Sequence, residues 1–443
     1  MLLHIGLDDT DSPDAGCTTY VAALLAERLL AMGAEFIDYP TLLRLNPNTP
    51  WKTRGNASVC LRFGLDESMQ GEAMNTALEL VDRYGEFRCE NTNPGVVFHV
   101  GEVPQDVKEF SECTVKRIVG LSEAEDIIER HGMAAVGWKN MRGIIGALAA
   151  VGGTLEGDHT YEMLTYRAPE NWGKERKVDA LSVCRMDHAL GDLTFNNVGE
   201  GGRPLITPHG PDPVLYGVRG ETAEAVYEAF TMVKALEPLE RWMLYRSNQG
   251  TDAHFSAPVK ISGLKPFNPA VVEASVVSTP ETLQGGHVIF RVSDGSDEVD
   301  CAAYEPTGAF RRIVRALLPG DLIMVYAGVR ELGGSLTLNV EKLEVTSLAE
   351  AVEYVNPRCP SCGGSMESMG QGQGYRCKKC GRRDRGLEKV PKNIPRDIKL
   401  GVYLPDRDAH RHLTKPLERY GREKTYVHSS MIGGWIGFTT RSP

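Results

Sequence analysis

The chain opens with MLLHIGLDDTDSPDAGCTTY over residues 1–20. Residues 1–7 form a short apolar run, which predicts a β-strand. An acidic turn follows, and Gly16 then precedes an expected helix over 18–32 that stops at Gly33. In open α/β sheets, ligands bind at the carboxyl ends of strands. The opening therefore predicts an α/β domain whose acidic loop lies at a binding site.

The acidic loop carries Asp8, Asp9 and Asp11, three carboxylates within four positions. Like charges this close repel one another unless a cation gathers them, and Mg²⁺ takes oxygen ligands that it shares with substrate phosphates. Thr18 begins the expected helix, where free amides and the helix dipole favour a phosphate. The residues alone equally allow a solvated turn with Thr18 as a plain N-cap.

Two further loops are candidates for binding residues. The stretch 51–56, WKTRGN, is basic and turn-forming, so it suits phosphates, although such a loop is more often plain surface. The stretch 207–213, TPHGPDP, is stiffened by proline and carries His209 and Asp212 between apolar runs. The sequence contains neither a P-loop nor the H-R-D set of protein kinases.

The middle of the chain changes pattern twice. Residues 35–115 alternate apolar runs with turn clusters, as in an α+β layer. From about 118, helical stretches such as SEAEDIIERHG and strands such as TYEMLTYRAP and PVLYGVRG, with a helix near 221–236, predict a ferredoxin-like domain. Residues 258–346 hold five or so β-rich runs, the first being PVKISGLK, and a helix, TGAFRRIVRALL, precedes the last two. That order matches the five-stranded OB-fold barrel.

The cysteine pattern near the C-terminus is the strongest local signal. Two C-x2-C pairs, Cys359 with Cys362 and Cys377 with Cys380, are separated by 14 residues. Four thiolates at this spacing predict a tetrahedral zinc site of the zinc-ribbon type. A module this small has little core, so the metal supplies most of its folding free energy. With four protein ligands the site is closed and structural.

Composition and charge fit a protein that contacts nucleic acid with one end. The chain is 42% hydrophobic and 24% charged, has no apolar run of the ~20 residues that a membrane span needs, and lacks a signal-peptide pattern, so we expect a cytosolic protein without membrane contact. The net charge is −10, but residues 354–443 hold 18 Lys and Arg against 8 Asp and Glu. This basic end favours RNA contact; a solvated tail is the alternative.

Taken together, the opening, the loop NTPWKTRGN, the stretch RGIIGALAAVGG, the loop ITPHGPDPVLYGVRG and the OB-fold with zinc ribbon resemble the archaeal tRNA(Ile) 2-agmatinylcytidine synthetase family over essentially the whole chain. The resemblance implies a multidomain α/β and α+β protein. The expected limits are a kinase-like catalytic domain at 1–117, a ferredoxin-like domain at 118–250, an OB-fold at 258–346, a zinc ribbon at 355–390 and a basic, partly helical segment at 391–443.

The resemblance also implies a reaction. The family uses ATP to phosphorylate the C2 oxygen of the wobble cytidine of CAU-anticodon isoleucine tRNA, and agmatine then displaces the phosphate. ATP ends as AMP, and a threonine of the opening motif, here Thr18, becomes phosphorylated; the OB-fold and zinc ribbon hold the tRNA. No protein partner is expected.

The expected site residues fall into three groups. The proposed catalytic and Mg²⁺-binding group is Asp8, Asp9 and Asp11, with Thr18 as the catalytic hydroxyl. The proposed ATP-binding group is Lys52, Arg54, Gly55 and Asn56. Agmatine carries two positive charges, so its pocket needs carboxylates, and the candidates are Asp187, Asp192 and Asp212.

Two other functions remain open from the sequence. OB-folds and zinc ribbons also occur in nucleic-acid-binding proteins without catalysis, but such a protein gives no purpose to the acidic opening. A tRNA-modifying enzyme that attaches lysine to the same base would carry the signature S-G-G-x-D-S, which the chain lacks.

Overall fold

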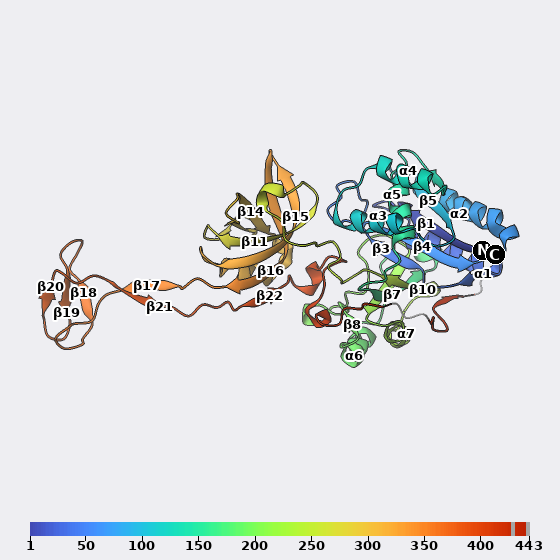
Figure 1. The fold of residues 1–443 in the computed structure, drawn as a ribbon. Helices are drawn as coiled ribbons and strands as arrows, with labels where there is room; N and C mark the ends of the chain where they lie inside the picture. The colour runs from blue at the N-terminus through green and yellow to red at the C-terminus, as the bar shows by residue number, and fades with distance from the viewer. Residues whose placement is uncertain (427–429, 440–443) are drawn as a thin grey trace.

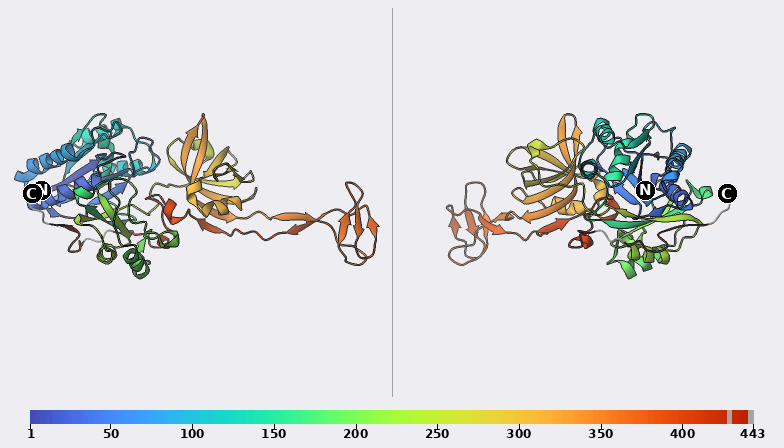
Figure 2. Two further views of the ribbon diagram at one scale, coloured as in Figure 1. Left: turned by 180° about the vertical axis from the view of Figure 1, so that it is seen from behind. Right: turned by 45° about the vertical axis from the view of Figure 1, so that its right-hand side comes forward.

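The protein is elongated, with a large body at one end and a small zinc-ribbon unit at the other (Figure 1). The computed structural model describes residues 1–426 and 430–439. Residues 1–254 build the body, the OB-fold lies beside it, and a thin two-stranded arm leads from there to the distal unit; Figure 2 shows the same order from two further sides. Within the described residues, no helix is long and apolar enough to cross a membrane.

One continuous sheet forms the centre of the body, in the order β6-β5-β1-β4-β3-β10-β7-β9-β8, with β2 on β4 and β23 on β10. Its strands are β1 (Leu2–Asp8), β2 (Glu35–Phe36), β3 (Thr41–Arg44), β4 (Ala57–Gly64), β5 (Gly95–Val100), β6 (Ala134–Gly137), β7 (Thr160–Arg167), β8 (Thr194–Phe195), β9 (Val214–Gly220), β10 (Leu239–Ser247) and β23 (Ile436–Phe438). The two halves join where β3 pairs with β10 in parallel, Thr41 opposite Arg246. Both neighbours of β1 are antiparallel, so the acidic loop lies at the end of a strand in a mixed sheet.

Helices cover both faces of the first half of the sheet. On one face α1 (Thr18–Ala31) and α2 (Gln70–Tyr84) pack on Leu3, Ile5 and Leu7 of β1. On the other face lie α3 (Gln105–Lys116), α4 (Leu121–Arg130) and α5 (Gly143–Gly152). Gly6 permits the closest approach, because a Cβ there would overlap the backbone of Ala147 in α5. The small residues of RGIIGALAAVGG thus bring α5 directly against β1.

The second half of the sheet carries α6 (Ala180–Leu190) and α7 (Ala223–Met232), which pack on β9. The helix expected near 221–236 is therefore present but shorter at both ends. The sequence placed the first domain limit after residue 117. However, β6 pairs with β5, and α4 and α5 share the core of α3, so residues 121–152 pack with the first half.

The OB-fold is a closed barrel whose order β11-β13-β14-β16-β15-β11 is that of a five-stranded Greek key. Its elements are β11 (Pro269–Val276), β12 (Glu281–Thr282), β13 (Val288–Ser293), β14 (Glu298–Ala303), α8 (Phe310–Arg315), β15 (Leu322–Leu332) and β16 (Ser335–Ser347), with β22 (Gly401–Tyr403) paired to β16. One expected strand is wrong: PVKISGLK forms only the 3-10 turn η4 (Ile261–Gly263), because Ser262-Gly263 interrupts the alternation.

The arm is the antiparallel pair of β17 (Val352–Val355) and β21 (Val390–Asn393). It carries the zinc ribbon, a three-stranded sheet of β18 (Met366–Ser368), β19 (Tyr375–Cys377) and β20 (Arg383–Asp384). Its core is small and centres on Cys359, Met366, Tyr375 and Cys377. The ribbon thus meets the rest of the chain only through the arm in the views shown (Figure 1, Figure 2).

After the arm the chain returns to the body, and residues 404–420 (the return segment) run from the OB-fold across the body. The expectation that the C-terminal segment is partly helical is wrong for its described part, which contains no α-helix and whose only helical elements are the 3-10 turns η6 (Arg407–Ala409) and η7 (Leu417–Arg419). Asp406 accepts a hydrogen bond from the Ala309 amide of the OB-fold (2.9 Å). Arg419, 1% exposed, pairs with Asp158 and Glu221 of the body. The segment is therefore fixed at both ends.

Candidate functional site

A cavity of about 450 Å³ opens where β1 ends, between the two halves of the sheet and the return segment. Nine of the expected residues line it: Asp8, Asp9, Asp11, Thr18, Lys52, Arg54, Gly55, Asn56 and Asp212. The acidic opening, the loop 51–56 and the loop 207–213 come from three distant parts of the sequence. The fold brings these three segments together around one cavity.

Asp8 and Asp9 form the acidic wall of the cavity. Asp8 ends β1 against α5, so closely that a Cβ on Gly146 would overlap its carboxylate. The Asn93 amide donates to Asp9 Oδ2 (2.8 Å). Burial and the neighbouring carboxylates raise the pKa of Asp8 well above its usual value. Burial raises the pKa of Asp9 to about 7, with Asp11 adding to the effect. Two carboxylates that resist ionisation side by side are suited to a cation.

Thr18 is the first residue of α1 and is 6% exposed. Its Oγ1 accepts a hydrogen bond from the Thr10 hydroxyl (3.0 Å) and a longer one from the Thr10 amide (3.3 Å). Cys17 before it has no side-chain capping bond. The Thr18 hydroxyl therefore lies at the cavity with its oxygen position fixed, at a helix end whose free amides favour a phosphate.

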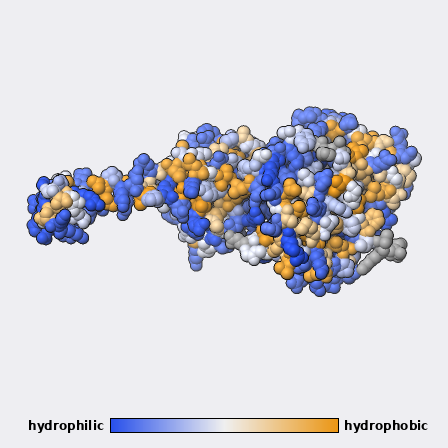
Figure 3. Space-filling model, turned by 90° about the horizontal axis from the view of Figure 1, so that it is seen from below, coloured by the Kyte–Doolittle hydropathy of each residue, from blue (hydrophilic) through white to orange (hydrophobic). Residues whose placement is uncertain are grey.

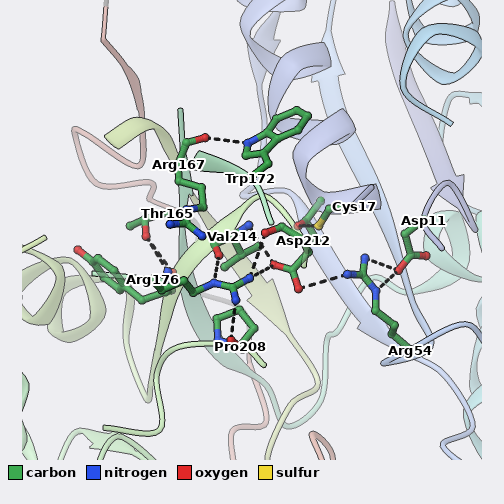
Figure 4. A network of polar contacts seen from close by, with 12 residues as sticks. Asp11, Cys17, Arg54, Thr165, Arg167, Trp172, Arg176, Pro208, Asp212 and Val214 are labelled. Atoms are coloured by element: carbon green, nitrogen blue, oxygen red, sulfur yellow. Dashed lines mark hydrogen bonds and ion pairs between the residues drawn. The ribbon is translucent and has the colours of Figure 1, made fainter. Parts of the chain in front are cut away.

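Arg54 joins two of the expected loops (Figure 4). Its Nε donates to Asp11 Oδ2 at 2.7 Å, and its Nη1 lies 3.2 Å from Asp212 Oδ2. Asp212 is held from its other side by Arg176 (3.1 Å), which also donates to the carbonyls of Pro208 and Val214. Asp212 thus has an arginine on each carboxylate oxygen.

The rest of the loop 51–56 has mixed roles. Lys52 lines the cavity, and burial with the nearby Arg411 and Arg330 lowers its pKa. Asn56 is in the left-handed region (φ 48°), and its amide donates to the Asn46 carbonyl (2.7 Å), so its side chain supports the loop. Gly55 has Arg44 beside it, 2.7 Å from where a Cβ would lie.

Two of the three carboxylates considered for agmatine are not in the cavity lining. Asp187 lies on α6 and accepts a hydrogen bond from Asn197 (3.1 Å). Asp192 follows α6, and its carbonyl oxygen contacts the Arg422 guanidinium. Of the three, only Asp212 is at the cavity.

Several lining residues carry no recognisable motif. The basic ones from the body are Arg44, Arg142, Arg203 and Arg219, and the return segment adds Arg407, Asp408, His410 and His412. The Arg142 guanidinium lies over the Trp51 ring, 4.4 Å from its centroid. Only the three-dimensional fold reveals these residues, since each comes from a strand end or turn of ordinary composition; basic composition was the one sequence signal for the return segment.

The four cysteines gather as expected. Their sulfurs lie within 4.8 Å of one another, with Cys359 and Cys380 at 3.6 Å and Cys362 and Cys377 at 3.5 Å. Backbone amides that point at the sulfur lower the pKa of Cys377 to about 6. Zn–S bonds of about 2.3 Å in a tetrahedron put sulfurs about 3.8 Å apart, so this geometry fits zinc. Among the described residues no other group of His, Cys, Asp or Glu gathers its ligand atoms this closely.

Comparison with known proteins identifies the family. Models described as the TiaS TCKD domain, the TiaS FLD domain and the TiaS C-terminal zinc ribbon match residues 4–140, 141–254 and 356–398. The isoleucine-tRNA 2-agmatinylcytidine synthetase TiaS of Pyrococcus horikoshii is 44% identical over 420 residues, which cover 94% of this chain and 97% of the relative. The chain belongs to the TiaS family. The TiaS of Thermococcus sibiricus is 43% identical over 416 residues, or 94% and 95% of the two chains.

Solved TiaS structures share the whole architecture. A complex of TiaS with its isoleucine tRNA and ATP superposes with a TM-score of 0.85 at 37% identity, covering 98% of this chain and 99% of the other. A complex of TiaS with the same tRNA, AMPCPP and agmatine gives 0.83 at 35% identity with the same coverage. The expected TiaS fold class, with several α/β and α+β domains and a zinc ribbon, is thereby confirmed, and a zinc ribbon belongs to the family pattern.

Proposed function

We propose that the chain is an isoleucine-tRNA 2-agmatinylcytidine synthetase, an ATP-dependent ligase that attaches agmatine to C2 of the wobble cytidine. The supporting observation is the match over 98% of the chain to a complex that holds the isoleucine tRNA, an ATP analogue and agmatine. The cavity supports it as well, because it combines carboxylates, arginines and a threonine hydroxyl. A protein that only bound nucleic acid would not need carboxylates, arginines and a threonine hydroxyl together in one cavity.

ATP and Mg²⁺ belong at the acidic wall of the cavity. A pyrimidine C2 oxygen leaves poorly, so it must first become a phosphate ester, and Mg²⁺ neutralises charge during phosphoryl transfer. Asp8 and Asp9 are the best ligands, since neither carboxylate has an arginine in hydrogen-bonding contact among the described residues. Asp11 was expected as a third ligand. Because Asp11 accepts a hydrogen bond from Arg54, we instead propose that Asp11 positions this arginine. Lys52 and Arg54 supply positive charge for the phosphates.

Thr18 is the proposed phosphorylated residue. Its hydroxyl lies at the N-terminus of α1, where a phosphate gains from the helix dipole. The hydrogen bond from Thr10 orients its oxygen. The geometry is compatible with phosphoryl transfer to Thr18 Oγ1.

Asp212 is the remaining candidate for recognising agmatine. Its two oxygens already accept from Arg54 and Arg176, so the guanidinium of agmatine would share or replace one of these contacts. Asp187 and Asp192 lie outside the cavity lining and are weaker candidates.

The OB-fold and zinc ribbon are the proposed tRNA-holding parts. Figure 3 shows that hydrophilic residues cover much of the distal unit on this face. Its exposed cations are Arg358, Arg376, Lys378, Lys379, Arg382, Arg383, Arg385 and Lys389. Phosphate contacts of this kind hold RNA without reading its sequence. The same role implies that the protein works in the cytoplasm, where tRNA is modified.

We propose that the first structural domain extends to about residue 152, because residues 121–152 pack with the first half of the sheet; the TCKD and FLD family models meet earlier, at residue 140. For the other domains we propose the limits expected from the sequence, with the OB-fold at 258–346 and the zinc ribbon at 355–390.

Labelled agmatine tests the function directly. The full chain is incubated with CAU-anticodon isoleucine tRNA transcript, Mg-ATP and labelled agmatine. In parallel reactions, labelled lysine or labelled arginine replaces agmatine. We expect label in the RNA with agmatine alone, and none when the wobble cytidine is changed to uridine. Asp8→Asn and Asp9→Asn should abolish labelling, and Asp126→Asn on the exposed face of α4 should not. Bound tRNA without label in any reaction would refute the assignment.

A further inference from the structure

Arg44 lines the cavity with a guanidinium that makes no hydrogen bond to any of the described residues. It ends β3, where its backbone is held on both sides by the Asn248 side chain (2.7 and 2.9 Å). The side chain is 12% exposed, and its Nε is fully buried without a partner. Its closest carboxylate among the described residues is Glu162, at 3.8 Å, too far for a hydrogen bond. A buried guanidinium left this way is costly, so the protein holds Arg44 ready for an acceptor that binds from the cavity.

Positive charge around Arg44 exceeds negative charge. Arg219 lies opposite Glu162 in the β7–β9 pair and donates to it at 2.9 Å. Lys52 adds a third cation to this part of the cavity. Burial lowers the pKa of Arg44 to about 10, and repulsion from Arg219 contributes. Glu162 is thus the one carboxylate of the described residues within 4 Å of Arg44 or Arg219. Asp11 also acts on Arg44 but is paired with Arg54, and Glu341 acts on Lys52 but is paired with Arg411.

His412, from the return segment, completes this wall without adding charge. Glu162 can only accept, so the Gln249 amide must point its NH₂ at Glu162 and its oxygen at His412 Nδ1 (3.0 Å). Arg219 Nη2 lies 3.4 Å from the same Nδ1 atom, and His412 Nε2 lies beside Gly55, 3.3 Å from where a Cβ would be. Burial and the cations Arg44 and Arg219 hold the pKa of His412 well below its usual value, so the ring is neutral.

We propose that Arg44, Arg219, Lys52 and His412 form a phosphate-binding pocket (the Arg44 pocket) that holds a phosphoryl group of the reaction. A phosphate dianion would offset the excess of about two positive charges, and it offers several oxygens to guanidinium forks. No carboxylate of the described residues fills this role. The absence of side chains at Gly55 and Gly217 leaves this part of the cavity open.

Two phosphoryl groups of the proposed function suit the pocket, one from ATP and one on the wobble cytidine. In the second case the pocket holds the leaving group. The amine nitrogen of agmatine then bonds to C2, the C2–O bond breaks, its electron pair leaves with the phosphate, and the nitrogen gives up its proton to solvent. The Arg44 pocket stabilises the charge that develops on the departing phosphate.

Phosphate binding is measured without tRNA or agmatine, so the result does not depend on the proposed function. Inorganic phosphate is titrated calorimetrically into the full chain at pH 7.5 and constant ionic strength. We expect saturable binding that Arg44→Gln weakens at least tenfold and Arg219→Gln weakens similarly. Arg130→Gln, an exposed arginine of α4, should bind as the wild type does. Melting of each variant is recorded, and Arg219→Gln carries the test if Arg44→Gln does not fold.

Single-turnover reactions with CAU-anticodon tRNA then separate the two sources. If the pocket holds the cytidine phosphate, Arg44→Gln still phosphorylates the tRNA but accumulates it without agmatine transfer. If it holds a phosphate of ATP, the variant raises KM for ATP and slows both steps. Unchanged phosphate affinity in folded Arg44→Gln and Arg219→Gln would overturn the pocket, even where wild-type agmatine transfer is confirmed.

Discussion

Arg54 contacts Asp11 with two guanidinium nitrogens, Nε at 2.7 Å and Nη2 at 2.6 Å from the same Oδ2 atom. Through its third nitrogen the arginine also reaches Asp212 in the other half of the sheet. One side chain thus ties the acidic loop to the loop 207–213. The two halves of the cavity are held together by a charge network as well as by the β3–β10 pairing.

Replacing Arg54 should therefore reduce activity and stability together. In Arg54→Ala, Asp11 and Asp212 lose a partner while still largely buried, and we expect a loss of about 2 kcal/mol in the free energy of unfolding. Agmatine transfer should fall more than tenfold. Urea denaturation and label incorporation measure both effects. Arg130→Ala, which breaks an exposed pair with Asp106, is the matched control; equal losses in the two variants would contradict the role of Arg54.

Zinc removal should unfold the distal unit and leave the body intact. The ribbon core is small, so the metal supplies most of its stability, and only the arm connects it to the barrel. We expect one zinc per chain by elemental analysis, which Cys377→Ser lowers. Hydrogen exchange should then rise across 356–398 and stay unchanged in β1 and α5. Equal loss of protection in the body would show that the ribbon supports the whole fold.

Buried neutral histidines should each cost stability in acid, while the raised pKa values of Asp8 and Asp9 act in the opposite direction. Burial lowers the pKa of His4 to about 3 and that of His159 to about 4. Below pH 6.5 the unfolded chain takes up these protons and the folded chain does not, so this stability is complete above pH 6.5 and falls as pH decreases. Each histidine contributes a loss of about 2 kcal/mol by pH 5. Urea midpoints between pH 7.5 and 5 measure the slope, which His4→Gln should reduce; an unchanged slope would exclude His4 as a cause.

The parts of the fold that depend on local pattern could be predicted from the sequence. The cysteine spacing, the strand and helix around the acidic loop and the order of β-rich runs each lie within a few tens of residues. The single sheet could not be predicted, because it requires Thr41 to pair with Arg246 across about 200 residues. The local alternation of apolar and polar residues predicts a strand, but it does not predict which distant strand it pairs with.

The same limit applies to the site. Asp8, Thr18 and Arg54 belong to loops whose composition already suggests phosphate or metal chemistry. Arg44 is the last residue of an ordinary apolar strand, and His412 lies about 400 residues after the acidic loop. Charge alone led to Asp187 and Asp192 as agmatine ligands, but which carboxylates face the cavity depends on how α6 packs against β9.

Two glycines on either side of the contact between β1 and α5 allow catalysis and stability to be separated. A Cβ on Gly146 would overlap the Asp8 carboxylate, whereas a Cβ on Gly6 would overlap the Ala147 backbone. A side chain such as Asp8 can rotate away, so Gly146→Ala should fold and lose ATP-dependent tRNA phosphorylation by more than tenfold. A backbone cannot yield so easily, so Gly6→Ala should lower the melting temperature most.

The matched control for this pair is Gly71→Ala in α2, where a Cβ meets open space. Replacing a helical glycine there should raise stability slightly and leave activity unchanged. Melting temperature and single-turnover phosphorylation are measured for all three variants. If Gly146→Ala retained full phosphorylation, the position of the Asp8 carboxylate would not matter for the reaction, and the acidic wall would lose its proposed role as the site of ATP and Mg²⁺.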